Sequence, residues 1–111
     1  MATFFATLCY ELDPATAPDA RKLLRAELVG RRWRDRHRER SMPAGALWIQ
    51  REAGAEETTD DVHRACAADL GRAVAAVVAT GRPVAVRRAW VQVAGAGTFG
   101  LVELDGGGSP A

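Results

Sequence analysis

Between positions 31 and 40 the chain reads Arg-Arg-Trp-Arg-Asp-Arg-His-Arg-Glu-Arg, so that every even position from 32 to 40 is an arginine. Guanidinium groups bind phosphate and carboxylate oxygens through charge-assisted hydrogen bonds. In a β-strand alternate side chains lie on one face, so this pattern predicts a row of arginines. The row contains Arg32, Arg34, Arg36, Arg38 and Arg40.

Such a row would neutralise successive phosphates of a nucleic acid, while Trp33 and His37, on the reverse face or at the strand end, would stack on bases. The competing interpretation is an edge strand that carries charge for solubility and against edge-to-edge aggregation. Asp35 and Glu39 interrupt the basic run and favour this second interpretation.

Two carboxylates, Glu11 and Asp13, follow an apolar stretch that reads as the first strand. Carboxylates at a strand end can hold Mg²⁺, which orients a water molecule for phosphodiester cleavage. Glu11 and Asp13 are therefore the candidate catalytic residues, with Mg²⁺ as the candidate cofactor and no cofactor as the alternative. Asp13 precedes Pro14, however, and an aspartate in that position is also an ordinary turn residue.

The overall charge of the chain does not favour general polyanion binding. The net charge is only +1, so a nucleic acid would have to meet a local basic patch. His37 and His63 are the only histidines and do not have metal-ligand spacing. Cys9 and Cys66 are predicted to be buried free thiols. The N-terminal residues lack the basic region of a signal peptide, and no run of the sequence approaches the ~20 apolar residues of a membrane span. We therefore expect a cytoplasmic protein.

The elements that position these residues follow from periodicity and turn signals. Strands are predicted at 3–12, over the arginine run, at 46–51 and at 84–93, the last with a bulge at Arg87-Arg88. A helix is predicted from Pro18 to a stop at Gly30, with continuation of that helix through the arginine run as the alternative. A long helix begins at Thr58 or Thr59 and closes before Gly81. A short last strand spans 98–104.

This order predicts an α+β protein with the ferredoxin-like βαββαβ sandwich and an extra C-terminal strand. Its antiparallel sheet, covered by two helices on one face, would have the order fourth, first, third, second, with the arginine strand at an edge. At 111 residues the chain is one domain, spanning 1–105, with a flexible tail at 106–111. Phe5, Cys9, Trp48 and Trp90 would leave an apolar sheet face, which predicts a homodimer.

The arrangement resembles the small CRISPR-associated ferredoxin-like endoribonuclease family and its toxin–antitoxin relatives over residues 3 to 104. The resemblance rests on an apolar first strand ending in Tyr10-Glu11, the arginine-rich second strand and the order of the elements. It implies that Glu11 takes the position of the family's metal-binding Asp, and that the final strand pairs with a partner subunit. Ser41-Met42-Pro43 replaces the family's aromatic motif after the arginine strand.

The sequence thus predicts a small dimeric ferredoxin-like protein that binds RNA or acts as a ribonuclease. The alternative is a non-enzymatic regulatory or interaction module whose arginines bind an anionic ligand or a protein partner.

Overall fold

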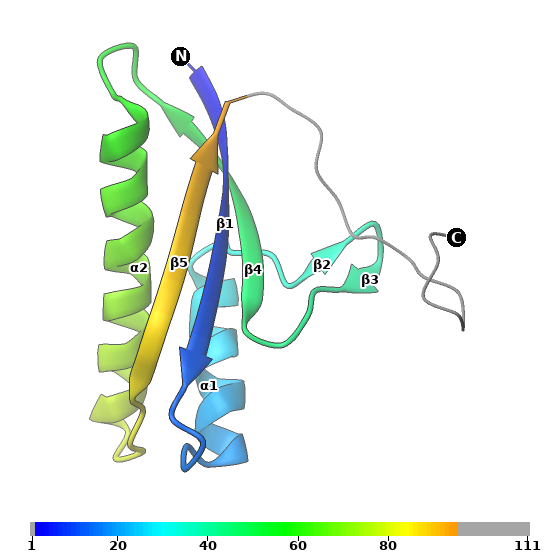
Figure 1. Cartoon of the computed structure of the whole chain (residues 1–111), viewed down its shortest axis with the longest axis vertical. Helices are drawn as coiled ribbons and strands as arrows, with labels where there is room; N and C mark the ends of the chain where they lie inside the picture. The colour runs from blue at the N-terminus through cyan, green and yellow to red at the C-terminus, as the bar shows by residue number, and fades with distance from the viewer. Residues whose placement is uncertain (1, 96–111) are drawn as a thin grey trace.

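The computed structural model describes residues 2–95. Within this range the elements follow in the order β1 (Ala2–Leu12), α1 (Pro18–Gly30), β2 (Arg36–His37), β3 (Arg40–Ser41), β4 (Ala46–Ala53), α2 (Thr59–Ala79) and β5 (Val86–Ala94) (Figure 1). The predicted α+β class is confirmed. The predicted strand at 98–104 and the tail at 106–111 lie outside the described residues.

The main sheet is antiparallel, with the order β4-β1-β5. β1 is central, as its apolar residues on both faces predicted: Leu8 pairs with Leu47 of β4 on one side and with Val91 of β5 on the other. The β1–β5 register slips between Glu11, which pairs with Arg88, and Leu12, which pairs with Val86. Arg87 is therefore the extra residue of a β-bulge, at the position where the sequence predicted one.

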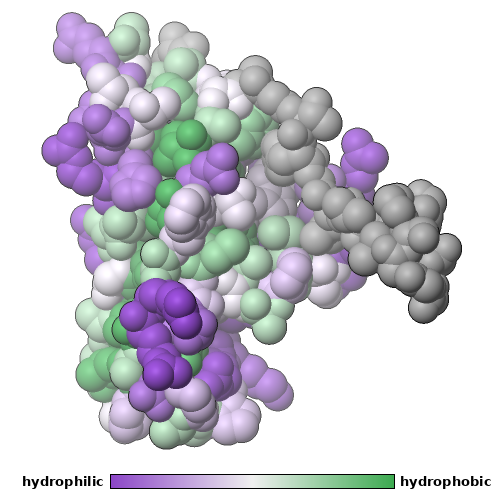
Figure 2. Space-filling model, in the orientation of Figure 1, coloured by the Kyte–Doolittle hydropathy of each residue, from purple (hydrophilic) through white to green (hydrophobic). Residues whose placement is uncertain are grey.

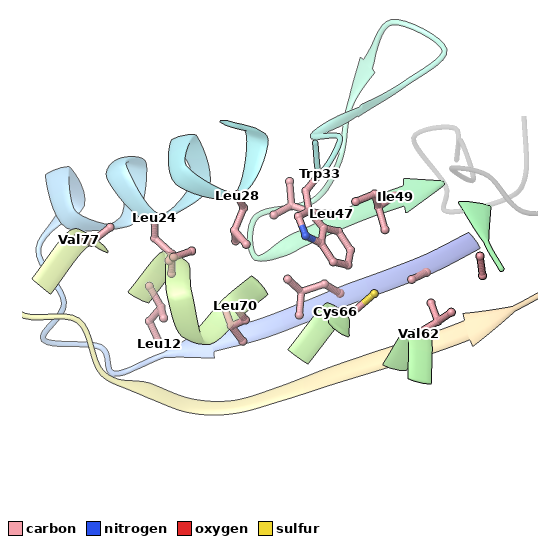
Figure 3. Close-up of a cluster of buried hydrophobic side chains, with 14 residues drawn as sticks. Leu12, Leu24, Leu28, Trp33, Leu47, Ile49, Val62, Cys66, Leu70 and Val77 are labelled. Atoms are coloured by element: carbon pink, nitrogen blue, oxygen red, sulfur yellow. The ribbon is translucent and has the colours of Figure 1, made fainter. Parts of the chain in front are cut away.

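One face of the sheet carries the core. The even-numbered residues of β1 point to this face, where Ala6, Leu8 and Leu12 are buried. Figure 3 shows side chains from both helices in the same cluster, with Leu24 and Leu28 from α1. The cluster also includes Val62, Cys66, Leu70, Ala73 and Val77 from α2. Both helices therefore pack on one face of the sheet, and among residues 2–95 no helix covers the opposite face.

The long helix α2 starts where its capping residues predicted. Thr58 is the N-cap: its side-chain oxygen accepts a hydrogen bond from the Asp61 amide at 3.2 Å. The Asp61 carboxylate accepts one from the Thr58 amide at 2.9 Å, which completes a capping box. These hydrogen bonds lower the pKa of Asp61 below its ordinary value of 3.8. The helix ends at Ala79, two residues before Gly81.

Helix α1 has the predicted bounds, Pro18 to Gly30, but the way it ends was not predicted. Gly30 is the last helical residue, but the left-handed residue that terminates the helix is Arg32, with φ of 77°. The Arg32 amide donates to the carbonyl oxygen of Val29, and the Trp33 amide donates to that of Leu28. This is a Schellman motif in which an arginine takes the position usually held by glycine. The motif turns Trp33 back toward Leu28 in the core.

The prediction of a continuous strand through the arginine run was wrong, and so was the alternative of a continuing helix. In the arginine segment, defined as residues 31–40, a single bridge joins Arg34 to Trp48 of β4. The chain then forms the two-residue strands β2 and β3, joined by a turn in which Arg38 and Glu39 have φ of 49° and 68°. Because these turns break the alternation, the arginines do not form one straight row on one face.

No helix within residues 2–95 is both long enough and apolar enough to cross a membrane. The two cysteines are free. Cys66 is buried in the core as expected, and burial raises the pKa of its thiol. Cys9 was expected to be buried but is exposed, because it lies on the face of β1 opposite to the helices.

Candidate nucleic-acid interface

Trp33 anchors the arginine segment in the core. Its side chain is 1% exposed, and its indole Nε1 donates a hydrogen bond to Oδ2 of Asp69 on α2 at 3.1 Å. Figure 3 shows the Trp33 ring within the cluster of buried side chains. Asp69 Oδ2 also accepts a hydrogen bond from Arg51 at 3.2 Å, so this oxygen is shared by two donors, and Oδ1 lies 3.6 Å from Arg72. In this structure the Trp33 ring is therefore not available for stacking on a base.

A second anchor lies on the other face of the sheet. The Arg34 guanidinium lies over the Trp48 ring, 4.5 Å from its centroid, and the Trp48 Nε1 donates to the carbonyl oxygen of Arg36 at 2.8 Å. The His37 ring meets the Trp48 ring edge-on, with 5.7 Å between centroids. Trp48, expected on an exposed face, is only 9% exposed. The segment thus folds over Trp48 and is fixed on it.

Between and beyond the two anchors the arginines face solvent. Arg36 donates to the carbonyl oxygen of Glu39 at 2.6 Å, which closes the hairpin. Within the described part of the chain the guanidinium groups of Arg32 and Arg38 have no hydrogen-bond or ion-pair partner. All the arginines predicted to bind nucleic acid are exposed: Arg32, Arg34, Arg36, Arg38 and Arg40. Figure 1 shows the β2–β3 hairpin projecting from the side of the sheet.

The acids in the arginine segment have separate positions. Asp35 lies near Arg25 of α1, with 3.9 Å between its Oδ2 and the arginine Nε. Its charge is therefore partly balanced by a residue outside the segment. Glu39 is exposed in the turn, next to Arg38 and Arg40, and lowers the local positive potential there.

The structure gives both catalytic candidates structural partners. Glu11 lies on the helix-free face, where its Oε2 is 3.2 Å from Nε of Arg88 and its Oε1 is 3.9 Å from Arg87. Asp13 Oδ1 accepts a hydrogen bond from the Ala15 amide at 2.8 Å, the turn geometry that its place before Pro14 indicated. Across residues 2–95 no three His, Cys, Asp or Glu side chains gather in a way that could hold a metal ion.

The helix-free face of the sheet combines polar and apolar residues. Trp90 is 66% exposed there, beside its cross-strand partner Cys9. Figure 2 shows this face, with strongly hydrophilic residues gathered near the end of β1 and the start of β5. Glu11, Arg87 and Arg88 account for charge in that region.

A second basic cluster lies on α1, at residues that were not predicted to form a site. Arg21, Lys22 and Arg25 of α1 line a cleft with Tyr10 of β1. Burial raises the pKa of the Tyr10 phenol, and Arg25 partly offsets that rise, so the hydroxyl stays protonated at neutral pH. The spacing of Arg25 from Lys22 and from Arg21, three and four residues, was a usable signal, because residues so spaced are neighbours on one side of a helix.

Comparison with known proteins found no matching family model, no matching curated protein and no matching solved structure.

Proposed function

We propose that the protein is a ferredoxin-like domain that binds single-stranded RNA through the arginine segment. RNA as the ligand class comes from the resemblance to ferredoxin-like endoribonucleases. The assignment to this fold is supported by the sheet order β5-β1-β4 and by the Arg34–Trp48 bridge, which lies at the edge where that fold has its second strand.

The observation that carries the proposal is the backbone of the segment. Within residues 2–95 the only non-glycine residues with positive φ are Arg32, Arg38 and Glu39, and all lie in this one stretch. A left-handed conformation costs an L-residue roughly 1–2 kcal/mol, and such strain concentrates at functional sites. Glycine would relieve it at each position. An arginine at two of them is explained if the guanidinium groups themselves are needed.

The anchoring of the segment supports the same proposal. Trp33 and Arg34 fix the start of the hairpin on opposite faces of β4, through Asp69 and Trp48. The arginines beyond are therefore held in place before a ligand arrives, which reduces the ordering cost of binding. Arg32 and Arg38, whose side chains have no partner among the described residues, are the groups best placed to meet phosphate oxygens.

The proposal is limited to binding. Glu11 is held by Arg88 and Asp13 stabilises its own turn, so a nuclease role for these residues would require both to exchange their partners for a metal ion. Single-turnover cleavage of labelled RNA with and without Mg²⁺ tests that role separately from binding.

A homodimer remains part of the proposal. Trp90 exposes 66% of its surface on the helix-free face, and association through that face would remove this apolar surface from water. The molar mass in solution, from light scattering over a range of protein concentrations, tests this part alone.

The binding experiment uses a fluorescent single-stranded RNA of about 12 nucleotides, within the site sizes of small RNA-binding domains. We expect affinity to fall as salt rises, with a log–log slope of about 0.7 for each phosphate contacted. Single-stranded DNA of the same sequence and heparin measure how much of the affinity is charge alone. If the protein shows no salt-dependent binding to the RNA, the proposed function is excluded.

A further inference from the structure

A cleft of about 650 Å³ lies between the end of β1, the first two turns of α1 and the loop that precedes β4. This volume is in the range of small-molecule sites, about 300–1,000 Å³. Gly45, one of the lining residues, cannot be replaced by a larger residue without strain. Its φ is 75°, and a Cβ there would lie 2.5 Å from the Tyr10 carbonyl oxygen. The cleft is thus built by a close approach of two backbone segments.

Two arginines of the cleft are held in position by backbone carbonyl groups. Arg21 donates from Nε to the Thr16 carbonyl oxygen at 3.0 Å and from an NH₂ group to that of Asp13 at 2.9 Å. Arg25 donates to the Met42 and Ala46 carbonyl oxygens at 3.2 and 3.4 Å. A guanidinium group has five N–H donors, so each arginine keeps donors for a ligand.

Lys22 is the least constrained cation of the cleft. It is exposed and has no hydrogen-bond or ion-pair partner among residues 2–95. The acid in the lining, Glu11, belongs to the opposite face of β1 and is paired with Arg88 at 3.2 Å. Its charge is therefore balanced outside the cleft. Asp35 lies 3.9 Å from Arg25 and balances part of its charge, so Arg21 and Lys22 supply most of the positive charge of the cleft.

The rest of the lining combines a hydroxyl group with apolar surface. The Tyr10 phenol lies beside Arg25, and Ser41 adds a second hydroxyl group. Met42 and Ala44 form most of the apolar part, because Leu12 also lines the cleft but is only 5% exposed. A bare ion would use the cations and leave this apolar surface in water. A ligand with an anionic group and an apolar body would use both.

We propose that this cleft binds a small organic anion, a carboxylate or phosphate monoester with an apolar body, at a site separate from the RNA surface. Arg21, Lys22 and Arg25 contact the anionic group, and Met42 and Ala44 contact the body. The inference does not rest on the proposed RNA binding, because the three cations of the cleft lie on α1, outside the arginine segment; Ser41 of β3 and the Arg25–Asp35 contact are where the two surfaces adjoin.

Phenyl phosphate is the probe. Two half probes are the controls: inorganic phosphate lacks the apolar body, and benzyl alcohol lacks the anionic group. We expect phenyl phosphate to raise the thermal unfolding midpoint and to bind more tightly in calorimetry than either half probe. Lys22→Gln should weaken its binding about tenfold, the typical effect of losing one charge-assisted hydrogen bond. Arg64→Gln, which removes an exposed positive charge from α2, is the matched control and should bind normally.

Lys22 also offers a direct readout, because it is the only lysine of the chain. Phenyl phosphate should slow its acetylation, measured by peptide mass spectrometry, while benzyl alcohol should not. Equal affinity in Lys22→Gln and wild type, unchanged acetylation, or no preference over inorganic phosphate would each overturn the inference.

A final experiment measures the RNA binding of the Lys22 variant. Lys22→Gln should bind RNA as well as Arg64→Gln does. If instead Lys22→Gln loses RNA affinity and RNA protects Lys22 from acetylation, the cleft is part of the RNA surface, and the small-anion site is rejected while the proposed function stands.

Discussion

The indole Nε1 of Trp33 donates a hydrogen bond to Oδ2 of Asp69 at 3.1 Å, and this contact ties the arginine segment to α2 across the core. The aromatic residue of the run is therefore a structural anchor, and the exposed arginines around it are the groups that can meet a ligand. The predictions below separate these two roles.

Asp69→Ala should destabilise the fold by about 1–3 kcal/mol, because it leaves the buried Trp33 N–H without an acceptor and removes the partner of Arg51. Urea unfolding measures the change. Glu56→Ala, at an exposed loop position, is the control and should stay within about 0.5 kcal/mol of wild type. Equal effects of the two substitutions would contradict the anchoring role of Asp69.

Arg32→Gly should raise stability by about 0.5–1 kcal/mol and weaken RNA binding. The gain arises because glycine adopts the φ of 77° without strain, and the loss because a guanidinium group is removed. Thermal unfolding and RNA titration measure the two effects. Arg64→Gly, inside α2, should instead lose about 1 kcal/mol. A destabilised Arg32→Gly would show that the arginine side chain contributes to the fold.

Glu39→Gly should raise both stability and RNA affinity. Arg38 and Glu39 both have positive φ, as in the two-residue hairpin turns that favour glycine at the second position. The substitution also removes an acid beside the arginines. Because Arg32→Gly changes RNA affinity in the opposite direction, the two variants together separate the effect of charge from that of backbone strain. A fall in RNA affinity for Glu39→Gly would argue against binding at the hairpin.

The capping box predicts a loss of stability in acid. The hydrogen bonds from Thr58 hold the pKa of Asp61 below 3.8, so the folded state binds the Asp61 proton less readily than the unfolded state does. The stabilisation is fully present above the unfolded pKa and is lost as the pH falls through the lowered folded pKa. Thermal unfolding should therefore show Asp61→Ala to be less stable than wild type near neutral pH, with a difference that shrinks as the pH falls below the ordinary aspartate range. A difference that persists at low pH would indicate another origin.

Much of the fold was predictable because its signals are local. Pro18 and Thr58 mark helix starts, and the alternation in β1 and the shift of apolar positions at Arg87 depend on near neighbours in the chain. The arginine run was wrongly predicted to be a continuous strand. Arginine is compatible with strand, helix and turn, so its alternation with other residues did not determine the backbone conformation. A long-range contact, Trp33 with Asp69, determines the path there.

The candidate site was predictable only in part. Exposure of the arginines was expected, whereas the burial of Trp33 and Trp48 was not, because an aromatic ring in a polar run can lie on either side of the chain. The cleft escaped prediction since its residues come from β1, α1 and the loop before β4, which only the folded sheet brings together.

The central claim is tested most directly by salt-dependent RNA titration of two double variants with equal charge. The first is Arg32→Gln with Arg38→Gln, and the second is Arg64→Gln with Arg82→Gln, at exposed ion pairs away from the arginine segment. The account predicts about tenfold weaker binding and a shallower salt slope for the first variant alone. Equal affinities and equal slopes for the two variants would contradict it.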